Sequence, residues 1–133
     1  MEQSPEPSLA FLKWAALAFA AVTVLITVVF FGWWAMKEHF VFGHDRYDPV
    51  RWMAPMTRQS YECQRGDMVL DVRQRLLQPG MRKSEVTTLL GRPSWEETGQ
   101  FEYDLGVCLW VVHGLRLYFD PQDRLVHSAI VQH

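Results

Sequence analysis

The sequence predicts an α+β protein in which an N-terminal transmembrane helix precedes a small domain of two helices packed on a three- to four-stranded antiparallel sheet. Three observations predict this architecture. An uncharged apolar run covers residues 14–36, apolar residues recur at helical spacing between residues 68 and 90, and apolar and polar residues alternate after Pro93. The predicted segments are an N-terminal tail, a transmembrane anchor, a linker and an α+β domain, at 1–13, 14–36, 37–66 and 67–133.

The apolar run WAALAFAAVTVLITVVFFGWWAM contains 23 residues without a charge. As a helix it is about 34 Å long, which exceeds the ~30 Å of a hydrocarbon core. Trp14, Trp33 and Trp34 at its ends are typical of interfacial aromatic belts. Cleavage at Ala18-Phe19-Ala20 as in a signal peptide would leave a strongly apolar new N-terminus. We therefore expect an uncleaved, single-pass signal anchor that contacts membrane lipid through residues 14–36.

The charges around this run leave its orientation open. Lys13 precedes it, and Lys37, Arg46 and Arg51 follow it. Counted literally, the positive-inside rule places the C-terminal domain in the cytoplasm, but the rule is weaker for long segments that follow the helix. The residues alone thus allow both orientations.

The predicted linker, residues 37–66, shows no sustained periodicity. Gly43, Pro49 and Pro55 interrupt any long helix or central strand. Trp52 is apolar enough to lie against the domain or the lipid headgroups.

Two short helices are predicted next. Asp67 is a suitable N-cap for an amphipathic helix over 68–77. For the second helix, Arg82 stands at the N-cap with Glu85 three residues later, and Gly91 suits the left-handed position after the last turn.

Strands are predicted beyond Pro93. Residues 101–105 and 115–119 alternate between apolar and polar, and residues 125–131 form a third strand after the type I turn signal of residues 120–123. The apolar segment 107–113 either extends a neighbouring strand or forms a separate one.

Composition narrows the classes of function. A formal net charge of −2 and a pI near 6.2 argue against a nucleic-acid partner. Cys63 and Cys108 lack CxxC or Cys/His spacing, which argues against zinc. In an oxidising compartment the two cysteines pair as a disulfide, and in the cytosol they are buried thiols. Their separation in sequence does not decide between these states.

Catalytic signatures are absent from the sequence. It contains no GxSxG, Walker, GxGxxG or HExxH motif. Four carboxylates cluster near the first predicted strand, and a solvated acidic edge explains them better than acid–base or calcium chemistry; they are Glu96, Glu97, Glu102 and Asp104. We expect no enzymatic activity, no cofactor, no metal and no small-molecule substrate.

Three stretches, PGMRKSEVTTLLGRP, FEYDLG and GLRLYFDPQDRLVHSAIV, resemble the SmpA/OmlA (BamE-like) domain, which belongs with the wider fold of the β-lactamase inhibitor protein. The resemblance covers roughly residues 66–131, and Arg82 stands where the family usually has Thr or Ser. It implies a small, non-enzymatic, extracytoplasmic α+β domain of the bacterial cell envelope that binds another envelope protein. Because no lipobox cysteine follows the apolar run, we expect anchoring in the inner membrane with a periplasmic domain, while a cytoplasmic domain stays open.

Candidate binding residues are the aromatic and basic side chains of the predicted sheet. Arg116 and Tyr118 lie on the strand face opposite the leucines, with Trp110 nearby, and such residues dominate protein interfaces. Trp95 is a further aromatic candidate. Two alternatives remain: an inhibitor or immunity-type protein that binds an enzyme, and a small enzyme or metal-binding protein, in which His127 and His133 bind metal only with further ligands from elsewhere.

Overall fold

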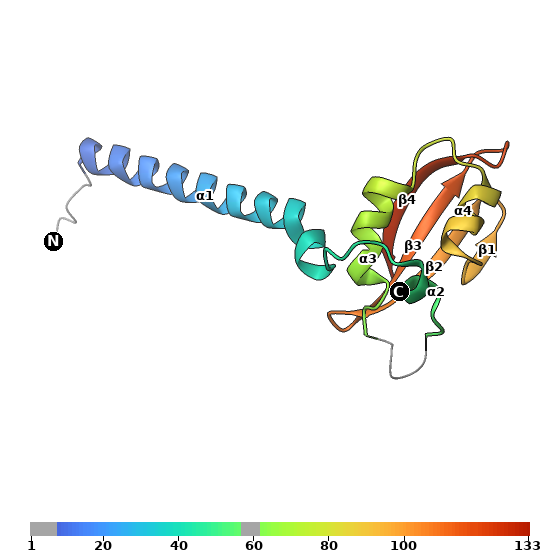
Figure 1. The fold of residues 1–133 in the computed structure, drawn as a ribbon. Coiled ribbons are helices and arrows are strands. Elements are labelled where there is room, and N and C mark those ends of the chain that lie inside the picture. Colours follow the sequence, from blue (N-terminus) through green and yellow to red (C-terminus); the bar gives the residue numbers. More distant parts are fainter. Residues whose placement is uncertain (1–7, 57–61) are drawn as a thin grey trace. The chain divides into compact units, whose positions relative to one another are not determined.

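The protein is described by a computed structural model that places residues 8–56 and 62–133. Its contacts divide the chain into two compact units, one ending at Lys37 and the other running from Glu38 to His133. Figure 1 shows the long first helix and the α+β domain. The predicted fold class is confirmed for its α+β character, its long apolar helix and its antiparallel sheet.

Helix α1 spans Leu9–Val41 and none of its residues is buried. By length and composition it can cross a membrane, with a mean hydropathy of 2.5 in its most apolar window. The hydroxyls of Thr23 and Thr27 donate to carbonyls one turn earlier, at 2.9 and 2.8 Å. Both threonines of the apolar run therefore satisfy their hydroxyl donors within the helix, as is favourable in a lipid-exposed segment.

Four antiparallel strands form the sheet in the order β1-β2-β3-β4. They are Trp95–Glu97, Gln100–Cys108, Val111–Phe119 and Leu125–Gln132. The predicted strands at 101–105, 115–119 and 125–131 are confirmed. The undecided segment 107–113 is split between β2 and β3 by a two-residue turn at Leu109–Trp110, because Cys108 pairs with Val111. Strand β1 escaped prediction because three residues are too few to display alternation.

Three short α-helices accompany the sheet, where two were predicted. They are α2 (Pro49–Met53), α3 (Gly66–Asp71), which continues as the π-helical turn η1 (Val72–Leu76), and α4 (Lys83–Leu90). In Figure 1 all of them lie over the same side of the sheet. Buried side chains from these helices meet the buried side chains of β2 and β3 in one core.

Helix α2 lies in the segment predicted to be a linker. Asp48 is its N-cap, and the carboxylate accepts hydrogen bonds from the backbone N–H groups of Val50 at 2.8 Å and Arg51 at 3.3 Å. Pro49 occupies the first helical position, where its missing N–H is no loss. The proline that argued against a long helix therefore begins a short one.

The next helix also differs from the prediction of one regular helix over 68–77. It begins at Gly66, one residue before the predicted N-cap Asp67, directly after the turn in which Asp67 N bonds to Cys63 O at 2.9 Å. Its last turn widens, because Leu77 N bonds to Val72 O five residues earlier, at 2.9 Å. The wider turn brings Leu77 into the core beside Val72.

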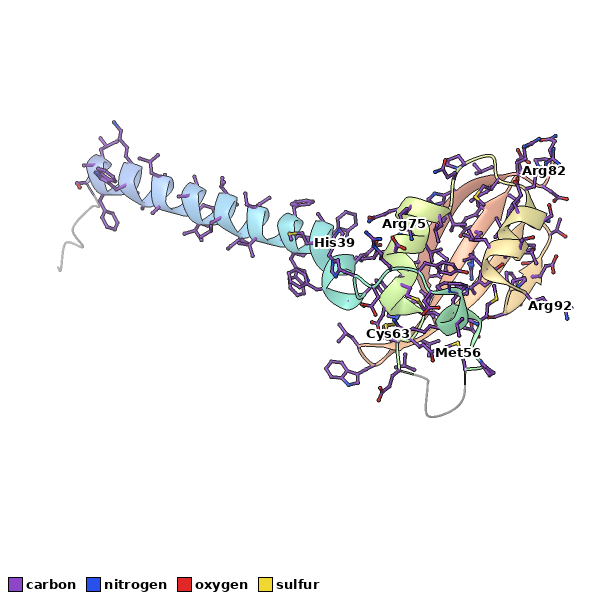
Figure 2. All side chains as sticks on the ribbon, viewed as in Figure 1. His39, Met56, Cys63, Arg75, Arg82 and Arg92 are labelled. Atoms are coloured by element: carbon purple, nitrogen blue, oxygen red, sulfur yellow. A yellow bond between two sulfur atoms is a disulfide. The ribbon has the colours of Figure 1, made fainter. Side chains whose placement is uncertain are left out.

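Helix α4 confirms its predicted ends. The Glu85 carboxylate accepts the backbone N–H of the N-cap Arg82 at 2.6 Å, and Gly91 follows the last turn with φ of 78°. Figure 2 places Arg82 at the end of the domain opposite Cys63. The sheet therefore has two distinct ends, with the β3–β4 turn near Arg82 and the β2–β3 turn near the cysteines.

The predicted boundary at residue 67 also differs from the structure, since the compact unit begins at Glu38. Trp52 is completely buried, and its indole N–H donates to Leu90 O of α4 at 3.0 Å. Phe42 is 4% exposed. Without periodicity, the sequence could not show that isolated aromatic residues of this segment complete the core of a later domain.

Candidate functional site

The face of the sheet opposite the helices carries the candidate site. Glu102, Arg116 and Ala129 are register partners across β2, β3 and β4, and Trp95 pairs with Glu102 from β1. Side chains on paired positions share one face. The same alternation that sends Phe101, Leu115 and Leu117 into the core thus gathers polar and aromatic side chains on the other face. We call this surface the outer sheet face; its central members are Trp95, Glu102, Arg116, Tyr118, His127 and His133.

Glu102 is the centre of this surface and is only 5% exposed. Its Oε2 accepts hydrogen bonds from Arg116 Nε at 2.9 Å and Nη2 at 2.7 Å, and its Oε1 contacts His133 Nε2. A buried carboxylate is tolerated only when it is paired in this way. The expectation of a solvated acidic edge is therefore wrong for Glu102.

Gly114 makes room for the buried carboxylate. A Cβ at this position would lie 2.5 Å from Glu102 Oε1 and 3.1 Å from its Cγ. Any side chain at residue 114 would therefore compete with Glu102 for the same space, and the glycine allows the carboxylate to lie flat across β3.

Arg116 is held from two sides. Besides its bonds to Glu102, its guanidinium lies 5.8 Å from the centre of the Trp95 ring, within the range of a cation–π contact. Hydrogen bonding to Glu102 raises the already high pKa of Arg116. The guanidinium is thus a fixed positive charge in a surface hollow that Trp95, Asp104, Val112 and His133 also line.

Tyr118 continues the surface along β3. Its ring stacks on His127 of β4, with ring centres 5.7 Å apart and planes 22° from parallel. Tyr118 and His127 are register partners, so the strand pairing itself sets this contact. Arg116 and Tyr118 therefore lie together on the predicted face.

Trp110 is not part of the outer sheet face. It is 93% exposed and occupies the second position of the β2–β3 turn. It is six positions away from Arg116, which at about 3.3 Å per residue is roughly 20 Å of strand. The sequence placed Trp110 near Arg116 because the length of the β2–β3 turn was unknown.

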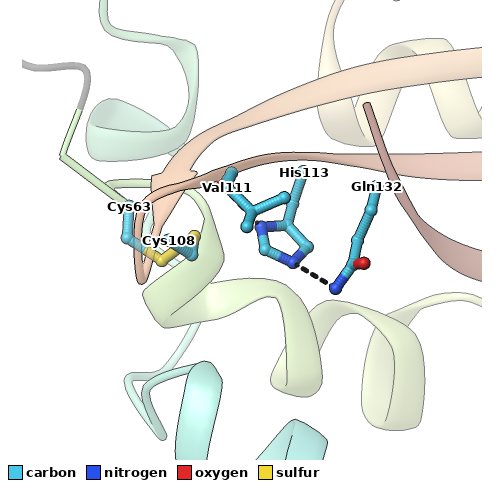
Figure 3. The surroundings of a disulfide bond; sticks show 5 residues. All are labelled: Cys63, Cys108, Val111, His113 and Gln132. Atoms are coloured by element: carbon cyan, nitrogen blue, oxygen red, sulfur yellow. Dashed lines mark hydrogen bonds between the residues drawn. A yellow bond between two sulfur atoms is a disulfide. The ribbon is translucent and has the colours of Figure 1, made fainter.

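A disulfide joins Cys63, just before α3, to Cys108 at the end of β2, with the Cα atoms 4.7 Å apart. Figure 3 shows this pair beside His113. Cys63 N also bonds to Val107 O at 3.1 Å. The bond therefore fastens the segment before α3 to the turn end of the β2–β3 hairpin.

His113 is 3% exposed and is engaged on both ring nitrogens. Nδ1 lies 2.8 Å from Val111 O, and Nε2 lies 3.3 Å from Gln132 Nε2, the contact drawn in Figure 3. Among residues 8–56 and 62–133, no group of three or more His, Cys, Asp or Glu side chains is arranged to hold a metal ion.

Comparison with models of protein families, with curated proteins and with solved structures finds no match to this chain. The relation to the BamE-like domain stays a prediction from the quoted motifs.

Sequence reasoning missed the central role of Glu102 and the contribution of His133. Glu102 and Arg116 occupy polar positions of two strands that were both predicted, so an assumed register would have suggested a cross-strand ion pair. No comparable signal pointed to His133, because its place beside Glu102 follows from the length of β4 and its register with β3.

Proposed function

We propose that this protein is a membrane-anchored module of the bacterial cell envelope that binds another protein through the outer sheet face and catalyses no reaction. The observation that carries the proposal is the ordered set of Trp95, Arg116 and Tyr118 on a sheet face that none of the described helices covers. Tryptophan, tyrosine and arginine are the residues most enriched at interface hot spots.

The side chains of the outer sheet face are already held in place in the free protein, and this order favours binding. Arg116 is immobilised by Glu102 and Trp95, and Tyr118 by His127. A long side chain that is already fixed loses little conformational entropy when a partner docks. The fixed positive charge fits a partner that presents a carboxylate or a backbone carbonyl to the hollow.

The anchor and the disulfide support a location at the inner membrane with the domain in the periplasm. Helix α1 is long enough to span the bilayer, and the Cys63–Cys108 bond suits an oxidising compartment. The resemblance to BamE-like domains implies the same compartment.

Two experiments test this proposal. A reporter that is active only outside the cytoplasm, fused through a linker after His133, is expected to be active, whereas activity of a cytoplasmic reporter instead would refute the periplasmic location. For binding, a photo-crosslinking amino acid replaces exposed His127 in intact cells, with exposed Thr88 of α4 as the matched control position.

We expect a discrete crosslinked protein adduct from position 127 and none from position 88. The adduct should weaken several-fold in a Tyr118→Ser background, which removes a ring from the surface without touching Glu102. Equal adducts from both positions, or none from position 127, would refute recognition by the outer sheet face.

A further inference from the structure

The tip of the β2–β3 hairpin carries Trp110, the most exposed large apolar side chain among the described residues. Trp110 is 93% exposed, Leu109 55% and Val112 39%. No Lys, Arg, Asp or Glu occurs between Asp104 and Arg116. A patch of this kind on a small domain marks an interaction site.

The backbone of this tip is unusual. Leu109 and Trp110 both have positive φ, 48° and 66°, in a two-residue hairpin turn. Asn and Gly normally occupy such turns, because other side chains are strained there. Strain of this kind persists where the surroundings hold it and concentrates at functional positions.

The surroundings do hold the tip. The disulfide fixes Cys108, the residue directly before the turn, to Cys63. Glu62 adds a parallel bridge to Val107. The hairpin therefore presents Leu109 and Trp110 on a rigid base.

The chain enters the domain close to this disulfide, at the turn end of the β2–β3 hairpin. Phe42, the first residue after α1, packs edge-on against His113 with ring centres 5.1 Å apart. Its ring also lies beside Gly66, next to both cysteine sulfurs. His113 is three positions away from Trp110, or about 10 Å along the strand.

These distances match the dimensions of a bilayer surface. If residues 14–36 span the hydrocarbon core, the five helical residues from Lys37 to Val41 extend about 8 Å further, which is about the thickness of one headgroup layer. The hairpin tip is thus within reach of the layer that the chain has just left. Tryptophan favours this layer because its ring is apolar and its N–H remains solvated.

We propose that Leu109 and Trp110 insert into the headgroup layer of the membrane that α1 crosses, so that the domain is held at the bilayer at a second point. The inference rests on the anchoring part of the proposed function. The absence of charge from residues 105–115 favours a lipid interface, with zwitterionic headgroups sufficient for binding.

The test uses the full chain labelled with 5-fluorotryptophan in phosphatidylcholine nanodiscs. Each tryptophan gives a fluorine NMR signal, assigned by single Trp→Phe variants. Lipid carrying a headgroup nitroxide broadens nearby signals, and a water-soluble gadolinium chelate broadens signals open to solvent. Trp52, which is fully buried, and Trp95, which is 43% exposed on the outer sheet face, are internal controls.

We expect the lipid nitroxide to broaden the Trp110 signal several-fold more than that of Trp95, and the gadolinium chelate to broaden Trp95 more than Trp110. Broadening of Trp110 by the chelate but not by the lipid would overturn the proposal and leave the tip as a surface for a protein partner. Trp33 and Trp34 report the anchor separately, because lipid broadening of their signals tests the spanning helix whatever Trp110 does.

Discussion

Replacing Trp52 by alanine tests whether the segment before residue 67 is part of the domain. Trp52 is fully buried, and its indole N–H donates to Leu90 O at 3.0 Å. Removing a buried tryptophan side chain costs about 3 to 5 kcal/mol, because transfer energy and packing are both lost. Trp52→Phe removes the same hydrogen bond together with part of the indole ring system, and it should cost less than Trp52→Ala because a phenyl ring still fills most of the site.

The fraction of unfolded domain is measured by pulse proteolysis of the full chain in mild detergent at a series of urea concentrations. This method does not use tryptophan as a probe. With a urea dependence of about 1.5 kcal/mol per M, Trp52→Ala should lower the midpoint by roughly 2 to 3 M. Val50→Ala on the same short helix is the matched control. Its side chain is 79% exposed, so its effect should stay below about 0.5 kcal/mol.

The reasoning fails if Trp52→Ala and Val50→Ala give the same midpoint. Residues 37–66 would then behave as the independent linker that the sequence suggests. An intermediate midpoint for Trp52→Phe would show that the remaining ring keeps part of the packing energy after the hydrogen bond is lost.

Three further predictions concern the domain. The Cys63–Cys108 bond closes a loop with a sequence separation of 45, so replacing both cysteines by alanine should cost about 4 kcal/mol by the loop-entropy relation, and mass analysis of unreduced protein from intact cells should find no free thiol. Gly66→Ala would place a Cβ 2.3 and 2.5 Å from the two sulfurs, so its large destabilisation should shrink in the alanine double variant. Hydrogen bonds from Arg75 and a backbone N–H lower the pKa of Asp71 from 3.8 to about 2. The stability that this shift contributes is complete above about pH 5 and is lost as the pH falls through about 2, so Asp71→Asn should reduce the pH dependence of the urea midpoint over that range.

The sequence was sufficient to predict the features that depend on residues close together in the chain. The Arg82 and Glu85 cap of α4, the Gly91 stop and the alternation of residues 115–119 all depend on residues a few positions apart. The apolar run from Trp14 to Met36 likewise predicts its helix without reference to the rest of the chain.

Tertiary structure decided the features that depend on residues far apart in the chain. Trp52 is buried only because α4 supplies an acceptor 38 residues later, and Glu102 is buried only because Arg116 and His133 meet it across the sheet. The register of β2 and β3 also places Trp110 in the turn and Arg116 further along β3. The hairpin tip and the outer sheet face are therefore two separate surfaces. Periodicity shows which residues share a face of one element, but burial and charge pairing depend on which elements meet, and that is set when the whole domain packs.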